Sequence, residues 1–119
     1  MTKVMLVDDD KNLQRVYLTL FKLNNLEIVA QAYDGVQAVE QYGSLNSKPD
    51  AVIMDQRMPR MDGITATRKI IEIDPDARII FLSADDTVES QARNAGAKLF
   101  LTKPISIETL LESIDLILE

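Results

Sequence analysis

The sequence predicts an α/β fold in which helices cover both faces of a parallel sheet. Short apolar runs alternate with longer amphipathic segments five times along the 119 residues. A continuous apolar run is typical of a strand buried on both faces, whereas apolar residues spaced three and four apart are typical of a helix packed on a core. Five repeats are too few for an eight-stranded barrel, so we expect an open, doubly wound sheet.

The first repeat pairs an apolar strand with an amphipathic helix. The strand is predicted at Val4–Val7 and the helix begins at Asp10, which is interpreted as its cap because a carboxylate suits the positive end of a helix. Asn24-Asn25 ends the helix. Its apolar stripe is expected to comprise Leu13, Val16, Tyr17, Leu20 and Leu23.

The second and third repeats are each opened by turn residues. The second strand is predicted at Leu26–Ala32, and Asp34-Gly35 turns the chain into the next helix. The apolar residues of that helix are Val36, Val39 and Tyr42. Pro49-Asp50 introduces the third strand, Ala51–Met54, and Asp62-Gly63 opens the helix that follows. Its buried face is expected to carry Ile64, Ala66, Thr67, Ile70 and Ile71.

The fourth and fifth repeats complete the sheet. Asp74-Pro75-Asp76 stops the third helix, and the fourth strand is predicted at Ala77–Leu82. A polar helix at Thr87–Asn94 is closed by Gly96, a favoured residue at a helix C-terminus. The fifth strand is predicted at Leu99–Thr102. The last helix is expected to begin after Ser106 as its cap and to bury Leu110, Leu111, Ile114 and Ile117.

The five repeats together indicate a topology. Right-handed crossovers place the helices on both faces of the sheet, and the most common arrangement is the flavodoxin-like strand order 2-1-3-4-5. Residues 1–119 are expected to form one domain, because this length is usual for one. No apolar run approaches the roughly 20 residues of a membrane span and no signal peptide is present, so we expect a soluble, cytoplasmic protein without membrane insertion.

Composition excludes several classes of function. The formal net charge is −6 and the pI is near 4.6, which argues against direct binding of nucleic acid. The chain contains no cysteine and no histidine. Disulfides, thiolate nucleophiles, zinc sites built from Cys and His, and Ser–His catalysis are therefore excluded.

Polar residues collect where the predicted strands end, which is where open α/β sheets carry their sites. Asp8-Asp9 follow the first strand, Asp55 the third and Ser83 the fourth, while Thr102-Lys103 end the fifth. Three carboxylates close together imply a compensating cation, and oxygen ligands without His or Cys favour Mg²⁺ or Mn²⁺. An aspartate beside such an ion, facing a hydroxyl and a lysine, is suited to phosphoryl transfer onto a carboxylate.

Each of these residues also has an ordinary structural interpretation. A run of aspartates after a strand is more often a solvated turn or a helix cap, Ser83 can cap the next helix, and Lys103 can be a surface lysine. These interpretations do not explain why the polar residues converge at four strand ends, and the convergence favours a shared function. The second strand ends in Gln31-Ala32 and adds no comparable group.

The sequence resembles the receiver domain of two-component response regulators over nearly its whole length. The motifs that carry the resemblance are Met5–Asp10, Asp55–Gly63, Ser83-Ala84, Ala95–Ala97 and Lys103-Pro104. The resemblance implies that Asp55 is the phosphoacceptor. It also implies that a sensor histidine kinase or a phosphotransfer protein donates the phosphoryl group. The chain has no glycine-rich loop that cradles nucleotide phosphates, so it is not expected to bind ATP.

The resemblance assigns roles to the residues around Asp55. Asp9, Asp55 and the backbone carbonyl of Arg57 are expected to coordinate Mg²⁺ directly, with Asp8 helping through water. Ser83 and Lys103 are expected to bind the phosphoryl group. The bond between Lys103 and Pro104 is expected to be cis.

The resemblance also implies how the signal is tuned and passed on. Arg57 and Asp85 flank the site, and their opposite charges suggest an ion pair that tunes attack by water. Phe100 stands at the position of a switch aromatic, where Tyr is more common, and is expected to act with Ser83. The output is expected to be binding of a downstream protein through the fourth helix, the fifth strand and the fifth helix, by a monomer or a phosphorylation-dependent dimer.

Two other functions compete with this one. A phosphatase with an aspartate nucleophile commonly has a second aspartate two residues later as general acid, but Arg57 stands there and a cap domain is missing. A receiver-like binding protein that is never phosphorylated does not need the complete acidic site. We therefore expect a signalling protein that promotes only its own phosphorylation and dephosphorylation. Met1 and the lack of a linker tail favour a single-domain regulator, of the chemotaxis or phosphorelay kind, over a receiver excised from a longer protein.

Overall fold

Five parallel strands form one sheet, which confirms the predicted fold class and strand order. The computed structural model describes residues 1–119. The strands are β1 (Thr2–Val7), β2 (Leu26–Ala32), β3 (Ala51–Asp55), β4 (Ile79–Ser83) and β5 (Leu99–Thr102). Their order across the sheet is β2-β1-β3-β4-β5, and every neighbouring pair is parallel.

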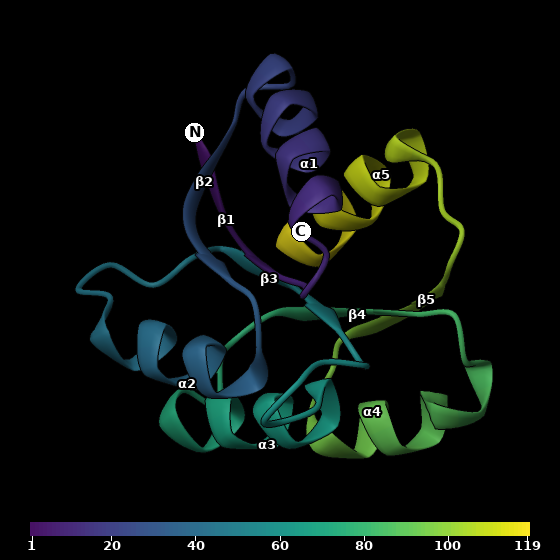
Figure 1. Cartoon of the computed structure of the whole chain (residues 1–119). Coiled ribbons are helices and arrows are strands. Elements are labelled where there is room, and N and C mark those ends of the chain that lie inside the picture. Colours follow the sequence, from purple (N-terminus) through teal and green to yellow (C-terminus); the bar gives the residue numbers. More distant parts are fainter.

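Helices cover both faces of this sheet (Figure 1). The helices are α1 (Lys11–Leu23), α2 (Gly35–Ser44), α3 (Gly63–Ile73), α4 (Glu89–Ala95) and α5 (Ile107–Leu118). Helices α1 and α5 lie on one face, and α2, α3 and α4 lie on the other (Figure 1). None of them combines the length and the apolar character that a membrane span requires.

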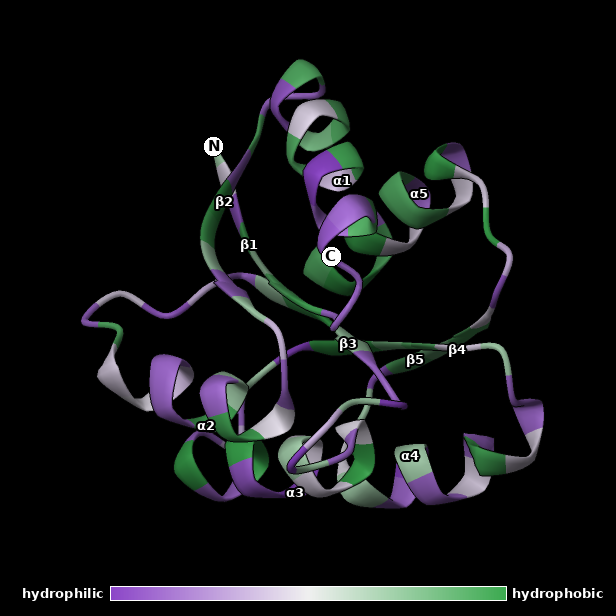
Figure 2. Cartoon of the chain, in the orientation of Figure 1, coloured by the Kyte–Doolittle hydropathy of each residue, from purple (hydrophilic) through white to green (hydrophobic).

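The two faces of the sheet support two separate hydrophobic clusters. Alternate residues of β1 point to opposite faces: Val4 and Leu6 belong to the cluster under α1 and α5, whereas Met5 and Val7 belong to the cluster under α2, α3 and α4. Strands buried from both sides need apolar residues at every position, and Figure 2 shows β1, β3 and β4 coloured as largely hydrophobic. The apolar runs in the sequence therefore reflect burial on both faces.

Most of the predicted helix ends are confirmed, and three of them illustrate why. The Asp10 carboxylate accepts hydrogen bonds from the backbone N–H groups of Asn12 and Leu13 at the start of α1. Gly96 ends α4 with a left-handed backbone at φ 119°. The Ser106 hydroxyl accepts the N–H of Thr109 at 3.1 Å and caps α5.

Several predicted boundaries are wrong, and β1 begins at Thr2 rather than at Val4. Strand β4 begins at Ile79 rather than at Ala77, because the N–H of Ala77 donates to the carbonyl of Asp74 and closes a turn. The polar helix predicted at Thr87–Asn94 is split into a 3₁₀ turn at Asp86–Val88 and the α-helix α4.

The predicted apolar stripe of α1 is also partly wrong. Val16 is 52% exposed and Leu23 is 74% exposed, so both lie outside the core. The residues of α1 that are buried are Gln14 and Phe21, with Tyr17 half-buried between them. The spacing of these three residues defines the buried face of the helix better than the leucines do.

Candidate functional site

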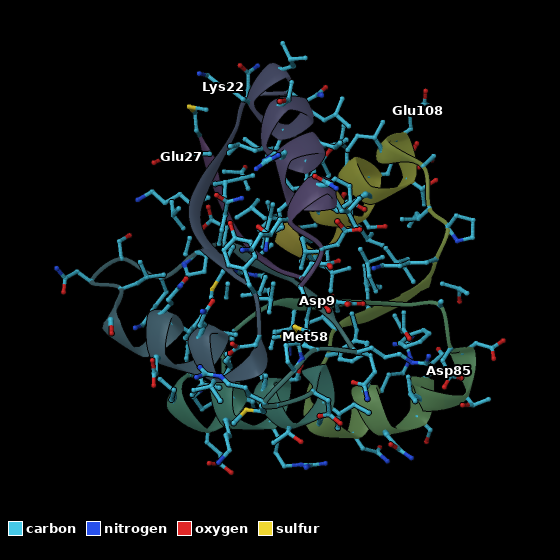
Figure 3. All side chains as sticks on the ribbon, viewed as in Figure 1. Asp9, Lys22, Glu27, Met58, Asp85 and Glu108 are labelled. Atoms are coloured by element: carbon cyan, nitrogen blue, oxygen red, sulfur yellow. The ribbon has the colours of Figure 1, made fainter.

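Three carboxylates meet at the carboxyl ends of β1 and β3. These two strands are neighbours, with Val7 paired to Met54, so the residues that follow them lie side by side. Asp8, Asp9 and Asp55 each place a carboxylate oxygen within 4.8 Å of the others. Asp8 is buried, Asp55 is half-buried, and Asp9 is exposed at the end of β1 (Figure 3). The cluster therefore offers oxygen ligands at one edge of the sheet.

Lys103 joins this cluster from the loop after β5. Its Nζ lies 3.2 Å from Asp8 Oδ2 and 3.2 Å from Asp55 Oδ1. Burial and the neighbouring Asp8 carboxylate raise the pKa of Asp55, although Lys103 acts in the opposite direction. Burial lowers the pKa of Lys103, but the two carboxylates outweigh it and the pKa lies above its usual value. One ammonium, paired with two of the three carboxylates, leaves negative charge for a further cation to balance.

Ser83 is positioned by the end of β4. Its hydroxyl oxygen accepts the backbone N–H of Asp85 at 3.0 Å, so its own proton remains free to donate. Its carbonyl accepts the N–H of Lys103 at 2.9 Å, which ties the end of β4 to the loop after β5. A cavity of about 170 Å³ opens here, lined by Asp55, Arg57, Ser83, Ala84, Asp85 and Lys103.

Arg57 and Asp85 both line this cavity, but the expected ion pair between them does not form. The Asp85 carboxylate instead accepts hydrogen bonds from the backbone N–H and the hydroxyl of Thr87, at the start of the 3₁₀ turn before α4 (Figure 3). These hydrogen bonds are the main reason why the pKa of Asp85 lies below its usual value. The Asp85 carboxylate therefore caps the 3₁₀ turn and does not pair with Arg57 as predicted.

Phe100 and Pro104 lie close to the site without lining this cavity. The Phe100 ring is buried in β5 and stacks on the Phe81 ring of β4, with 5.8 Å between centroids and 14° between planes. Both rings belong to the cluster under α2, α3 and α4. The peptide bond between Lys103 and Pro104 is cis.

The loop from Gln56 to Asp62 is anchored at both ends. The Gln56 carbonyl accepts the N–H of Gly63, and its side-chain oxygen accepts the N–H of Ile64, both at 3.0 Å. Within the loop, Arg60 pairs through Nε with Asp34 Oδ2 at 3.1 Å. The carbonyl of Arg57 lies between these anchors.

Three further residues support the site without being among those predicted from the sequence: Gln14, Gln56 and Arg60. Gln14 is buried in α1 and donates a hydrogen bond to the carbonyl of Asp8 at 3.0 Å. Gln14 precedes Tyr17 by three residues and Phe21 by seven, a spacing that places all three on the same buried face of α1. The roles of Gln56 and Arg60 depend on loop geometry, and no local pattern indicates them.

Comparison with known proteins agrees with this geometry. The family described as the response regulator receiver domain matches residues 4–115. The chemotaxis protein CheY of Bacillus subtilis is 41% identical over 115 residues, covering 95% of this chain and 94% of that protein. The transcriptional regulatory protein PdtaR of Mycobacterium tuberculosis is 40% identical over 116 residues, or 96% of this chain and 55% of that protein. A crystal structure of a CheX–CheY–BeF₃–Mg²⁺ complex from Borrelia burgdorferi superposes with a TM-score of 0.93 at 31% identity, covering 99% of this chain and 90% of that chain.

Proposed function

The chain belongs to the family of response regulator receiver domains, and on that premise we propose that it accepts a phosphoryl group on Asp55. The observation that carries the proposal is the position of Lys103, whose Nζ lies 3.2 Å from Asp55 Oδ1, beside a cavity that Ser83 also lines. We take residues 1–119 as one domain with this function. We take the donor to be a sensor histidine kinase or a phosphotransfer protein, as membership of this family implies.

In the proposed transfer, a carboxylate oxygen of Asp55 attacks phosphorus. The bond between Asp55 and phosphorus forms as the bond between phosphorus and the imidazole nitrogen of the donor breaks, and the electron pair leaves with the imidazole. The Lys103 ammonium and the Ser83 hydroxyl then bind the phosphoryl oxygens, on which charge is spread during transfer. Both groups are already held at the ends of neighbouring strands.

The donor set of the cluster fits Mg²⁺, with Mn²⁺ as the alternative. All the side-chain donors are carboxylates, and their oxygens lie within 4.8 Å of one another. Asp9, Asp55 and the carbonyl of Arg57 would hold the ion directly, with Asp8 acting through water. The bound ion would supply charge neutralisation at the phosphoryl oxygens. Support also comes from the CheY of Borrelia burgdorferi, which was crystallised with Mg²⁺ and BeF₃.

The donor protein would dock beside Lys103 on an apolar surface. A second cavity, of about 360 Å³, shares Ala84 and Lys103 with the site. Its other walls are Leu13, Tyr17, Pro104 and Ile105. Apolar walls continuous with the phosphoacceptor site suit a protein partner that must bring its own reactive group to Asp55. The output would use the face of α4, β5 and α5, through which a downstream protein is bound.

The test is labelling with acetyl phosphate, followed by intact mass. Wild-type protein with Mg²⁺ should gain one phosphoryl group, and Asp55→Asn or an excess of EDTA should abolish the gain. Asp10→Asn is the matched control, because Asp10 caps α1 and Asn is an equally good cap. Normal labelling of Asp55→Asn would refute the assignment. Steady turnover of other phosphate esters would instead favour an enzyme.

A further inference from the structure

We propose that Gln14 is a positioning residue for metal binding: its buried amide fixes the peptide between Asp8 and Asp9 and so aims the Asp9 carboxylate at the cation. The proposal rests on the function given above. Gln14 lies on α1 and touches neither the cavity nor a carboxylate of the cluster, so it would act only through the backbone.

Every hydrogen-bonding group of the Gln14 amide is used inside the protein. The side chain is 1% exposed. Its Nε2 donates to the Asp8 carbonyl at 3.0 Å and to the Ala32 carbonyl at 2.7 Å. Its Oε1 accepts Nε2 of Gln31 at 2.9 Å. Two carbonyls on one side and an N–H donor on the other allow a single orientation of the amide.

These contacts hold the backbone of Asp8 on both sides. The Ala32 carbonyl that binds Gln14 also accepts the N–H of Asp8 at 3.1 Å. The Asp8 carbonyl, held by Gln14, belongs to the planar peptide that continues into Asp9. Gln14 therefore sets the direction in which the chain leaves β1 and enters the cluster.

Asp9 depends on this backbone more than its neighbours do. The Asp8 carboxylate is held by the N–H of Asp10 at 2.9 Å and by Lys103, and Asp55 is held by Lys103. The Asp9 carboxylate is exposed and makes no hydrogen bond or ion pair. Its position is therefore determined by the backbone from which it projects.

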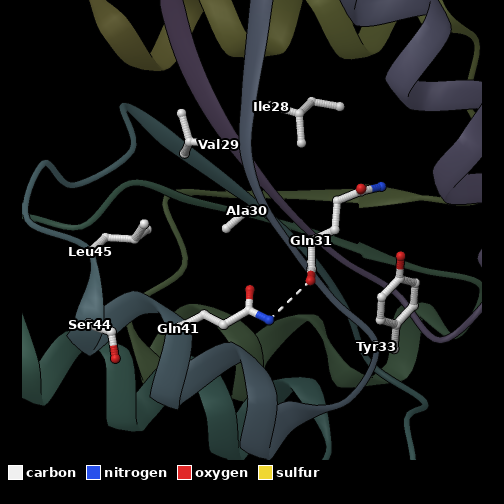
Figure 4. A pocket seen from close by; sticks show the side chains of 8 residues that line it. All are labelled: Ile28, Val29, Ala30, Gln31, Tyr33, Gln41, Ser44 and Leu45. Carbon is white, nitrogen blue, oxygen red and sulfur yellow. Dashed lines mark hydrogen bonds between the residues drawn. The ribbon is translucent and has the colours of Figure 1, made fainter.

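The chain also provides a matched control on the outer side of the same network. The carbonyl of Gln31 accepts Nε2 of Gln41 at 3.1 Å, while the side chain of Gln31 points away from Gln41 (Figure 4). Gln31→Met removes the hydrogen bond to Oε1 of Gln14 but leaves the two hydrogen bonds from Gln14 to the carbonyls of Asp8 and Ala32. Gln14→Met keeps an unbranched side chain of similar length and removes all three bonds.

The experiment is titration of the unphosphorylated protein with MgCl₂ at constant ionic strength, followed by backbone amide NMR shifts, with Tm measured on the same samples. Gln14→Met should weaken Mg²⁺ affinity by roughly 3- to 10-fold, at or below the usual loss for residues that orient metal ligands. Gln31→Met should stay within about twofold of wild type. Gln14→Leu provides a second variant if Gln14→Met does not fold.

A double-mutant cycle with Asp9→Asn separates positioning from a merely structural role. If Gln14 acts by aiming Asp9, the loss of affinity caused by Asp9→Asn should be at least about twofold smaller in the Gln14→Met protein than in wild type. Independent losses, or a lowered Tm with unchanged Mg²⁺ affinity, would overturn the role of Gln14. Absence of Mg²⁺ binding by wild type would overturn the proposed function itself.

Discussion

At the scale of single residues, the hydroxyl of Thr67 in α3 is buried and has no hydrogen-bond partner. A buried polar group without a partner costs about 1–3 kcal/mol. Thr67→Val replaces the hydroxyl with a methyl group of the same shape, and should raise the free energy of unfolding by ~1 kcal/mol in denaturant titrations. Thr67→Ser keeps the hydroxyl but removes a buried methyl, and should lower it. A loss of stability in the valine variant would mean that the hydroxyl is hydrogen-bonded in solution.

Asp55 is expected to reduce stability when no metal is bound. Burial and Asp8 disfavour its charged form, as its raised pKa shows. Asp55→Asn removes one repelling charge and should raise the Tm in EDTA by a few degrees, since ~1 kcal/mol corresponds to roughly 4–8 °C for a domain of about this size. Saturating Mg²⁺ should stabilise wild type more than the variant, so the difference in Tm between the two proteins should become smaller or change sign. Equal Tm values in EDTA would show that the carboxylates do not repel in the folded protein.

At the scale of elements, the effect of adding a methyl group can be compared at two helical glycines: Gly63, which contacts the site, and Gly43, which does not. A Cβ on Gly63, at the start of α3, would lie 2.0 Å from the carbonyl oxygen of Asp55. Gly63→Ala should therefore push β3 and α3 apart, lower stability by at least ~2 kcal/mol, and slow labelling of Asp55. The nearest atom to a Cβ on Gly43, inside α2, is a side-chain carbon of Ile73 at 3.8 Å. Gly43→Ala should be stabilising by ~0.5–1 kcal/mol, because alanine favours a helix. Equal effects of the two changes in thermal unfolding would contradict this.

The cap of α2 makes stability depend on pH. The pKa of Asp34 lies below its usual value of about 3.9, mainly because its carboxylate accepts the N–H of Gln37. The hydrogen bond and the positive charge of Arg60 lower the pKa further, by a smaller amount. A depressed pKa adds stability above the unfolded pKa, and that stability is lost as the pH falls through the folded pKa. Asp34→Asn keeps a helix cap and should cost ~0.5–1 kcal/mol at pH 7, a modest value because Arg60 is largely exposed. The difference from wild type should shrink below about pH 4. A difference that is constant down to pH 2 would show that charge is not its cause.

At the scale of the whole molecule, the fold follows from the sequence more directly than the site does. Five apolar runs separated by amphipathic segments allow few topologies, and the strand order is the predicted one. Predictions of single residues were wrong where two groups compete for the same hydrogen-bond partner. The N–H of Ala77 donates to the carbonyl of Asp74 in a turn, so Ala77 lies outside β4. The Asp85 carboxylate accepts the N–H of Thr87 and does not pair with Arg57. Such choices depend on which partner lies nearest in space, which residue spacing alone does not reveal.

A change at Asp55 is expected to reach the rest of the molecule through Ser83 and Phe100. The chain has three phenylalanines: Phe81 and Phe100 stack in the cluster under α2, α3 and α4, and Phe21 lies in the cluster on the opposite face. Protein labelled with fluorophenylalanine should therefore give three fluorine signals. Binding of Mg²⁺ and beryllofluoride should draw the Ser83 hydroxyl toward the beryllium-bound fluorine atoms, which stand in for phosphoryl oxygens, and away from the N–H of Asp85 that it now accepts. Ser83 pairs with Thr102 in neighbouring β5, two residues after Phe100, so we expect the Phe100 ring to respond to the space released.

The signal of Phe100 should shift most and that of Phe21 least, with Phe81 between them because it touches the moving ring. Ser83→Ala should reduce the Phe100 shift while Mg²⁺ still binds, since Ser83 is not among the carboxylates of the cluster. The ring needs only a differential free energy of about 1–3 kcal/mol between its two positions for such coupling. Equal shifts of all three signals would indicate a global change in packing. An unchanged Phe100 signal would mean that the ring is buried permanently and that the signal leaves the site by another route, while Asp55 would remain the proposed phosphoacceptor.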